Sequence, residues 1–418
     1  ARHLSKLTEA LVVDMGGTSF DASLVKEGQV ELKPEGEIAR LRIALPMLDI
    51  VTIGAGGGSI GWIDAGGLLR MGPQSAGAAP GPACYGRGGE LPTCTDANVV
   101  LGYLDPVSFA GGALPLQVDR ARRAIEEHVA RPLGMDVEAA AVGMYRVINA
   151  NMAHGVREIT VKRGLDAREF PMVVAGGAAG LHACAIAAEL ELRTVLAPAF
   201  ASVLCATGML MTDIQHDFVR SLVGPLAKID PLRLRKLVAD MIAEGAAQLA
   251  REGLAAADMR HEVALDLRYL KQYHEVTVNV ARAAIDTGAL ADVAIPFHAE
   301  HDRLYGYNLA EQGTGLELIN VRVRSIGRVE RPVLPRLPRD GPDSRHALTG
   351  ERRAWVPETA RFATLPVYDG HKLRAGNTFV GPALVERTDT TLLVSAAFTA
   401  RVDDLGTCVL ELANGGAR

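Results

Sequence analysis

The segment LVVDMGGTSFDASLV, from Leu11 to Val25, constrains the fold of this chain more than any other stretch. Residues 11–14 begin with a short apolar run that contains β-branched side chains, which predicts a buried strand. Residues 20–25 predict a second strand, because they carry no helical period. A Gly-Gly-Thr turn joins the two. This strand–turn–strand pattern differs from the Walker arrangement, in which the glycines lead into a helix.

Two adjacent glycines in such a turn allow backbone N–H groups to surround a phosphate. Gly16, Gly17 and the hydroxyl-bearing Thr18 are therefore candidate phosphate-binding residues. Asp14 and Asp21 flank the turn, where a water bound to Mg²⁺ would link them to that phosphate, so both are candidate metal and catalytic residues. The alternative is a tight β-hairpin that carries an aspartate on each side, and the rest of the chain has to decide between the two.

Composition limits the classes of partner. The 418 residues predict two or three domains, and 48% apolar residues provide ample cores without any run that approaches membrane-spanning length. A net charge of −5 without a basic cluster makes nucleic acid and anionic membranes poor partners. Five scattered cysteines with no zinc-type spacing predict a reducing compartment, the cytoplasm. The start lacks a Met and a signal-peptide core and enters a strand almost at once, which suggests a fragment or a processed piece.

A glycine-rich run extends from Ile53 to Gly89, and its glycine and proline content excludes a long helix. Low-complexity disorder is one interpretation, but apolar and aromatic residues such as Trp62, Leu68 and Tyr85 are atypical of a solvated linker. We therefore expect an ordered loop region with close backbone approach. Such regions often carry binding sites, and a purely scaffolding role is the alternative.

Residues 119–211 have the hydrophobic pattern of alternating helices and strands. The predicted helices are 119–128, 137–161, 181–190 and 202–211, and the predicted strands are 170–175 and 194–197. The turn that begins at Gly176 and Gly177 leads into a helix N-terminus, which suits the phosphate or ribose of a nucleotide. His154 and Arg157 are predicted to be surface groups or satisfied polar groups of the core.

This order of motifs resembles the second lobe of the actin-like ATPase superfamily, whose chaperone members carry a DLGGGTFD-type phosphate loop. The resemblance assigns to the phosphate motif Asp14, Gly16, Gly17, Thr18 and Asp21. It assigns Gly176 and Gly177 to the adenosine motif and residues 206–209 to the second connecting helix. Asp21 either holds the Mg²⁺ shell or orients an attacking water.

Longer motifs sharpen the resemblance. DMGGTSFD, the glycine-rich run with PGPACYGRGG, PTCTDANVVLG, ITVKRG, GGAAGLHA and GPALVERTDTT together resemble the hydantoinase A/oxoprolinase family over nearly all of residues 1–418. That family includes ATP-dependent cyclic amide hydrolases (5-oxoprolinase, N-methylhydantoinase) and the large subunits of ATP-dependent ketone carboxylases. Its members normally carry an N-terminal lobe with a DxGGTxTD loop. This sequence lacks that loop, so we expect half of the nucleotide cleft to come from elsewhere.

The resemblance implies an α/β fold, with an actin-like (ribonuclease H-like) ATPase lobe and glycine-rich insertion at residues 1–225. A β-rich α+β C-terminal domain is expected at 226–418. The implied cofactors are ATP and Mg²⁺, the implied substrate is a small cyclic amide or ketone, and the implied partner is a hydantoinase B type subunit. The expected chemistry is phosphorylation of a carbonyl oxygen in an amide hydrolase. The alternatives are a biotin-independent ketone carboxylase and a non-catalytic scaffold lobe.

The C-terminal part is predicted to contain an amphipathic helix at 232–252. The predicted strands there are 261–269, 274–280, 316–326, 354–362, 383–385, 391–394 and 407–412. His298 and His301, spaced i, i+3 without a nearby third ligand, are predicted to lie on a helix surface rather than in a metal site. Residues 271–274, KQYH, resemble a variant of the carboxylase-like branches, and amide hydrolases more often have a glycine there.

Overall fold

The computed structural model describes residues 7–33, 36–38, 40–43 and 47–413, which form two compact units. The first unit comprises the described residues up to Gly208 and those from Val333 onward, and the second comprises residues 209–332. The expected division at residue 225 therefore differs from the division into compact units. The physical reason is strand pairing, since a strand near the C-terminus pairs antiparallel with residues 194–197.

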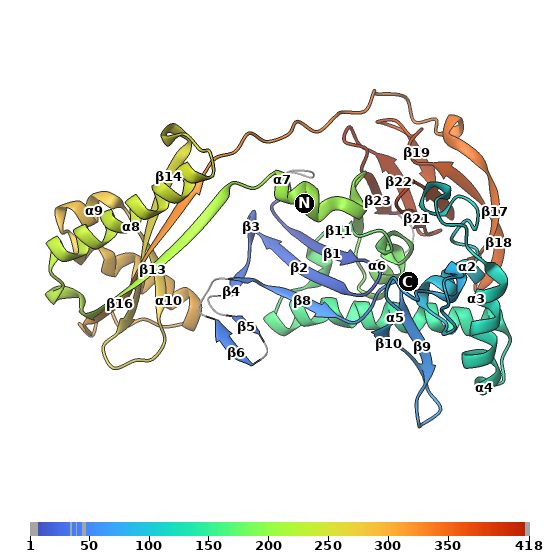
Figure 1. Cartoon of the computed structure of the whole chain (residues 1–418), viewed down its shortest axis with the longest axis horizontal. Helices are drawn as coiled ribbons and strands as arrows, with labels where there is room; N and C mark the ends of the chain where they lie inside the picture. Colours follow the sequence, from blue (N-terminus) through green and yellow to red (C-terminus); the bar gives the residue numbers. More distant parts are fainter. Residues whose placement is uncertain (1–6, 34–35, 39, 44–46, 414–418) are drawn as a thin grey trace. The chain divides into compact units, whose positions relative to one another are not determined.

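The first unit is built on a mixed sheet in the order β19-β22-β23-β12-β11-β1-β2-β3, and β8 also pairs with β2 (Figure 1). Strands β1, β11 and β12 run parallel, and the other pairs are antiparallel. The strands are β1 Ala10–Met15, β2 Phe20–Lys26, β3 Gln29–Val30, β8 Ile50–Ile53, β11 Met172–Ala175, β12 Thr194–Ala197, β19 Thr378–Val380, β22 Phe398–Val402 and β23 Cys408–Leu412. The predicted strands in these regions are confirmed, whereas β8, β19 and β22 were not predicted.

Alternation along β1 assigns its side chains to two faces of this sheet. Leu11, Val13 and Met15 are fully buried and pack in the main core with helix α5, Val137–Ile159. Burial of each such side chain contributes about 1.5–3 kcal/mol. The opposite face carries a smaller core, to which Ala10 and Leu204 belong, and alternation directs Asp14 to this face.

The remaining helices of the first unit are α2 Cys94–Val100, α3 Val118–Ile125, α4 Arg131–Leu133, α6 Ala183–Glu189 and α7 Leu204–Leu210. Among them, α3, α6 and α7 agree with prediction to within a few residues at their ends, whereas α2 and α4 were not predicted. A π-helical turn, Glu126–Ala130, joins α3 to α4. Asp136 begins α5, because its carboxylate accepts the N–H of Ala139 at 2.7 Å.

The glycine-rich run is ordered, as predicted. It forms an antiparallel hairpin of β9, Ser59–Ile63, and β10, Leu69–Ser75, followed by a 3₁₀ turn at Ala83–Tyr85. The buried carboxylate of Asp96 ties this turn to α2, accepting the N–H and the hydroxyl of Thr93 at 2.8 and 2.7 Å and the N–H of Cys84 at 2.7 Å. Asp96 thus completes a capping box and fixes the loop that precedes the helix.

A further sheet of the first unit has the order β17-β18-β20-β21. Its strands are β17 Leu348–Val356, β18 Arg361–Asp369, β20 Ala383–Glu386 and β21 Thr391–Val394. The prediction of one strand at 354–362 is wrong, since a turn at 357–360 separates β17 from β18. The chain reverses in this turn, which contains Pro357 and Ala360, and Ala360 has a φ of 48°. Trp355 packs on Phe362 across the hairpin. The first unit also contains two short antiparallel strand pairs. In one, β4 Leu32–Lys33 pairs with β7 Met47–Leu48, and in the other, β5 Gly36–Ile38 pairs with β6 Leu41–Ile43.

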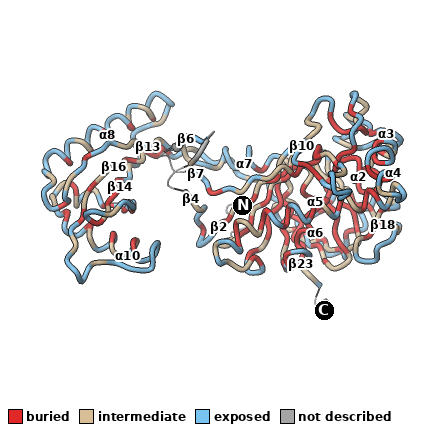
Figure 2. The backbone as a smooth tube through the Cα atoms, turned by 90° about the horizontal axis from the view of Figure 1, so that it is seen from below, coloured by how far each residue is buried: buried red, intermediate tan, exposed pale blue. Residues whose placement is uncertain are grey.

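The second unit is a four-stranded antiparallel sheet, among the described residues, in the order β13-β16-β14-β15. Its elements are β13 Ile214–Pro225, α8 Pro231–Arg251, β14 Met259–Tyr269, β15 Val276–Val280, α9 Arg282–Thr287, α10 Ala294–Tyr305 and β16 Leu316–Gly327. Figure 2 shows that α8 alternates buried and exposed positions, in agreement with the predicted amphipathic pattern. Long strand β13 was not predicted.

In the described part of the chain, no helix has the length and apolar character to cross a membrane.

Candidate functional site

The turn after β1 is held in place by the glycine-rich run. The N–H of Gly57 donates to the carbonyl of Gly16 at 3.0 Å, and the N–H of Gly58 donates to the carbonyl of Gly17 at 2.6 Å. A Cβ atom placed on Gly56 would lie 2.5 Å from the backbone nitrogen of Thr18. The glycines of the run therefore permit a backbone approach that no side chain would allow.

Gly16 and Gly17 differ from these packed glycines. A Cβ atom on either residue would meet no atom of the described residues within 4 Å, and neither has a positive φ. The N–H of Gly16 bonds weakly to the carbonyl of Ser19, at 3.3 Å. In the described part of the chain, no hydrogen bond uses the N–H groups of Gly17 and Thr18. Open space and unused donors are the properties expected of an anion cradle.

Asp14 and Asp21 are register partners across β1 and β2, so the structure brings them together on one face. Directly opposed carboxylates repel one another unless a cation or hydrogen bonds compensate. Asp21 accepts the hydroxyl of Thr52 at 2.5 Å, and Asp14 accepts the thiol of Cys205 on α7 at 3.2 Å. The bond to Asp14 raises the pKa of the Cys205 thiol, and partial burial adds to the rise.

The predicted Mg²⁺ shell rests on these two carboxylates. Among the described residues, no group of three or more His, Cys, Asp or Glu side chains forms a complete metal cage. Paired aspartates beside a turn with unused N–H groups nevertheless fit Mg²⁺, because this ion keeps several waters and uses one or two carboxylates together with substrate phosphates.

The second glycine turn is packed more tightly than the first. Gly176 has a φ of +85°, and a Cβ atom there would lie 2.2 Å from the carbonyl oxygen of Met15. The N–H of Ala178 donates to that same oxygen at 3.1 Å. Gly177 would place a Cβ atom 3.0 Å from the carbonyl oxygen of Asp389. The structure therefore brings the two predicted glycine motifs into direct contact.

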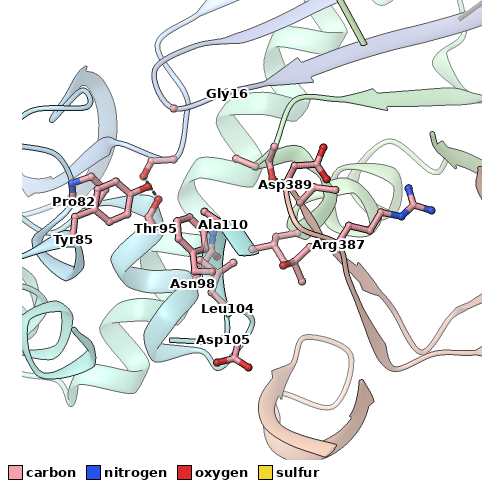
Figure 3. Close-up of a pocket in the computed structure, with 18 of the residues that line it drawn as sticks. Gly16, Pro82, Tyr85, Thr95, Asn98, Leu104, Asp105, Ala110, Arg387 and Asp389 are labelled. Carbon is pink, nitrogen blue, oxygen red and sulfur yellow. Dashed lines mark hydrogen bonds between the residues drawn. The ribbon is translucent and has the colours of Figure 1, made fainter. Parts of the chain in front are cut away.

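A cavity of about 260 Å³ adjoins both turns (Figure 3). Gly16, Gly17 and Gly177 line it, whereas Asp14 and Asp21 are absent from the described residues of its wall. The other segments of its wall are 57–58, 77–85, 95–98, 104–110, 178–181 and 386–391. In Figure 3, Thr95 and Asn98 of α2 lie between Tyr85 on one side and Asp389 on the other.

Residues 386–391 were not predicted to belong to the site. The hydroxyl of Thr390 donates to the carbonyl of Gly177 at 3.0 Å, and Ser202 bonds to the carboxylate of Asp389. The one sequence signal for these residues was the motif GPALVERTDTT, which is among the stretches that resemble the family. Nothing local in that motif indicated that it returns to the N-terminal glycine turn.

A buried polar network lies behind the cavity wall. The ring of His182 is fully buried and stacks on Tyr145, with centroids 5.1 Å apart. Its Nδ1 lies 3.0 Å from Oδ1 of Asn149, and its Nε2 lies 3.2 Å from Nδ2 of Asn98. Burial lowers the pKa of His182 to about 3, so the ring is neutral near pH 7. None of these residues was predicted as part of the site.

The other histidine predictions have different outcomes. His154 and Arg157 lie at the surface, where they pair with Glu158 and Glu189, as predicted. The prediction of a helix surface for His298 and His301 is wrong for His301, which is 1% exposed on α10. It belongs to an aromatic cluster around Tyr269, and its Nδ1 lies 2.8 Å from the carbonyl oxygen of Tyr307. His298 is half-buried, with its Nδ1 2.7 Å from the Tyr269 hydroxyl.

Comparison with family profiles decides the kinship of this chain. Residues 1–218 match the profile described as Hydantoinase/oxoprolinase, and residues 232–412 match the Hydantoinase/oxoprolinase C-terminal domain. The chain belongs to the hydantoinase/oxoprolinase family. The two profiles meet near the expected division at residue 225, whereas the compact units divide at 208 and 332.

Two named relatives are similar over most of this chain. It is 36% identical to caprolactamase subunit alpha of Pseudomonas jessenii, over 96% of its own length and 58% of the relative. It is 34% identical to the acetophenone carboxylase gamma subunit of Aromatoleum aromaticum, over 95% of its own length and 56% of the relative. The chain thus spans under three fifths of the length of these relatives, both of which are named as subunits.

Two solved structures share the mixed α/β fold. A crystal structure of the ATP-dependent caprolactamase from Pseudomonas jessenii matches with a TM-score of 0.79 and 35% identity, over 99% of this chain and 60% of that one. A nucleotide-free structure of acetone carboxylase, described as concerning ATP-dependent acetone carboxylation, matches with a TM-score of 0.83 and 26% identity. That match covers 99% of this chain and 59% of the other.

Proposed function

We propose that this chain is the ATP-binding part of an ATP-dependent cyclic amide hydrolase that activates a carbonyl oxygen by phosphorylation. The observation that carries the proposal is the open turn at Gly16 and Gly17, which lines a cavity together with Gly177 and in which the N–H groups of Gly17 and Thr18 are unused among the described residues. The 36% identity to a caprolactamase subunit favours a cyclic amide as the substrate class.

The arrangement of strands supports an actin-like ATPase lobe. The meander β1–β2–β3 is followed by β11 and β12, which lie parallel to β1. Both glycine turns lie at the same end of these strands, since Met15 ends β1 and Gly176 follows β11. Ligands of parallel sheets bind beyond the carboxyl ends of the strands.

ATP supplies a phosphoryl group that converts an amide oxygen into a better leaving group. In the proposed mechanism, the N–H groups of Gly17 and Thr18 bind phosphate oxygens and offset their negative charge. Asp14 and Asp21 would hold the hydrated Mg²⁺, or Asp21 would orient an attacking water. Positioning and charge neutralisation are the main contributions of a protein to phosphoryl transfer. Gly177 borders the adenosine.

The proposal includes further components of the enzyme. Because the chain spans under three fifths of its relatives, we propose that an N-terminal lobe with a second phosphate loop completes the cleft. The relatives' names as alpha and gamma subunits support a partner of the hydantoinase B type, which would contribute to the substrate end of the site.

A ketone carboxylase is the second candidate. The 34% identity to acetophenone carboxylase gamma and the KQYH sequence at 271–274 favour it. Lys271 has a φ of 72° and Tyr273 is 91% exposed, so this segment is a turn with a projecting ring. Lactam-dependent ATP hydrolysis by the assembled enzyme would favour the hydrolase. Bicarbonate-dependent carboxylation of a ketone would favour the carboxylase, and no turnover with either would favour a scaffold lobe.

The phosphate-site assignment is tested by Asp14→Asn in the assembled enzyme. We expect ATP turnover to fall by at least about 100-fold, because removing one charge weakens Mg²⁺ binding at the transferring phosphate, while the melting temperature stays constant. Exposed Asp302→Asn in α10 is the matched control and should leave turnover unchanged. Unaltered turnover in Asp14→Asn would disprove the assignment of the phosphate turn.

A further inference from the structure

The cavity wall contains a buried acceptor without a partner. Asn98 lines the cavity and is 3% exposed, and its Oδ1 has no hydrogen-bond partner among the described residues. Leaving a buried acceptor unsatisfied costs about 1–3 kcal/mol, and native proteins satisfy the great majority of such groups. An unpaired acceptor on a residue that lines a cavity is a candidate partner for a ligand that donates a hydrogen bond.

The network behind Asn98 determines which amide atom remains unpaired. Nδ2 of Asn149 donates to the carbonyl of Tyr145 at 2.8 Å, so Oδ1 of Asn149 faces His182 and accepts the proton of Nδ1. Because neutral histidine carries only one ring proton, Nε2 of His182 is then an acceptor. Nε2 accordingly accepts a hydrogen bond from Nδ2 of Asn98, and the two atoms lie 3.2 Å apart. Sγ of Cys94 lies at the same corner, 3.4 Å from Nε2 and 3.7 Å from Nδ2 of Asn98. A flipped Asn98 would turn its Oδ1 toward the acceptor Nε2, so Oδ1 stays the unpaired atom.

The surroundings of Asn98 suit a flat heteroaromatic ring. Tyr85, Leu104, Phe109 and Leu181 contribute apolar surface to the same cavity, and Gly16 and Gly17 border it as well. A purine nucleotide has both properties, a planar base and a phosphate chain. Among the common purine bases, adenine has an exocyclic amino donor at the position where guanine and hypoxanthine have a carbonyl acceptor.

We propose that Asn98 selects adenine by accepting a hydrogen bond from the exocyclic amino group of the base. His182 and Asn149 are then positioning residues that fix the orientation of the Asn98 amide. This inference rests on the proposed ATP-binding function. It adds a residue that determines base specificity and that the phosphate and adenosine motifs do not contain.

The first test uses the unaltered, assembled enzyme and calorimetric titration with Mg²⁺ and three nucleotides. The nucleotides are ATP, inosine triphosphate (carbonyl in place of the amino group) and N6,N6-dimethyl-ATP (no amino proton). We expect ATP to bind at least about tenfold more tightly than either analogue, since one hydrogen bond to a buried acceptor and the repulsion of a second acceptor separate them. This experiment does not depend on the folding of any variant.

The second test compares variants by the same titrations. Asn98→Ala should reduce the preference for ATP over inosine triphosphate to within about threefold, because the acceptor is gone. Asn149→Ala should reduce the preference partly, since His182 can then take the other tautomer, and should leave phosphate binding intact. Asn151→Ala, which removes a bond to the carbonyl of Met71 outside the network, is the control and should retain the preference.

Each outcome separates this inference from the function on which it rests. Tight binding of ATP without discrimination among the three nucleotides would overturn the role of Asn98 and leave the ATP site standing. Discrimination that persists in Asn98→Ala would also overturn that role. If the assembled enzyme binds none of the three nucleotides, both the inference and the proposed function are wrong.

Discussion

The glycine turns at residues 16–17 and 176–177 look alike in the sequence, but glycine occurs in them for different physical reasons. At Gly176 the fold itself excludes a side chain, because φ is positive and the carbonyl oxygen of Met15 occupies the space. At Gly16 and Gly17 the fold permits a side chain, since the described residues leave the space open. Glycine is required for packing at the first position. At Gly16 and Gly17 packing does not require it, and the proposed phosphate site gives it a reason.

This difference separates stability from binding. A glycine that is required for packing should reveal itself in the free energy of unfolding, whereas a glycine kept open for a ligand should reveal itself only in affinity. Gly177 lies between the two cases, because it lines the cavity and also approaches the carbonyl oxygen of Asp389. Substituting each position by alanine therefore tests the distinction directly.

Gly176→Ala should have the largest effect. A left-handed alanine costs about 1–2 kcal/mol, and an overlap with backbone atoms costs a further 1–3 kcal/mol, so we expect the free energy of unfolding to fall by about 3 kcal/mol. Thermal melting of the protein measures this change. Gly164→Ala is the matched control, since its φ is +72° but a Cβ atom there meets no described atom within 4 Å. Equal losses in both variants would mean that φ alone matters.

Gly17→Ala should have an intermediate effect that is confined to binding. We expect ATP affinity in the assembled enzyme to fall by about tenfold, or 1.4 kcal/mol, because the methyl group intrudes on the phosphate cradle. The melting temperature without nucleotide should stay within about 1 °C, since surface changes of this kind alter stability little. Gly341→Ala, equally open but outside the cavity wall described here, is the control. Destabilisation comparable to that of Gly176→Ala would remove the distinction.

Gly177→Ala should have the smallest effect. A Cβ atom at 3.0 Å from the Asp389 carbonyl requires the segment 386–391 to move slightly, which we expect to cost on the order of 0.5–1 kcal/mol in stability. ATP affinity should change by less than about threefold. The ratio of the two effects, measured by melting and calorimetry, shows whether this position belongs with Gly176 or with Gly17.

Local patterns in the sequence predicted much of the fold and part of the site. The strands on either side of the Gly16 turn, helix α5 and helix α8 carry clear periodicities, so their positions were predicted closely. The joint position of Asp14 and Asp21 also followed, because a tight turn between antiparallel strands makes them opposite neighbours. These features depend on residues within one or two turns of chain.

Features that depend on distant parts of the chain were not predictable in this way. The approach of residues 386–391 to Gly177 and the network of Asn98, His182 and Asn149 join elements that are far apart in sequence. His301 is polar and was predicted at a surface, yet a carbonyl bond and neighbouring rings satisfy it within a core. One strand was predicted at 354–362 because apolar periodicity continues across a tight hairpin.

The return of the C-terminal strands has a consequence for the order in which the chain can fold during synthesis. Residues 209–332 are contiguous and can fold as soon as the ribosome releases them. The first unit has to wait, because β23 pairs with β12 and residues 386–391 complete the cavity wall, and these segments emerge only after the second unit. Both glycine turns are thus synthesised before residues 386–391, and the cavity that joins them to the rest of the site forms only after those residues have returned to the first unit.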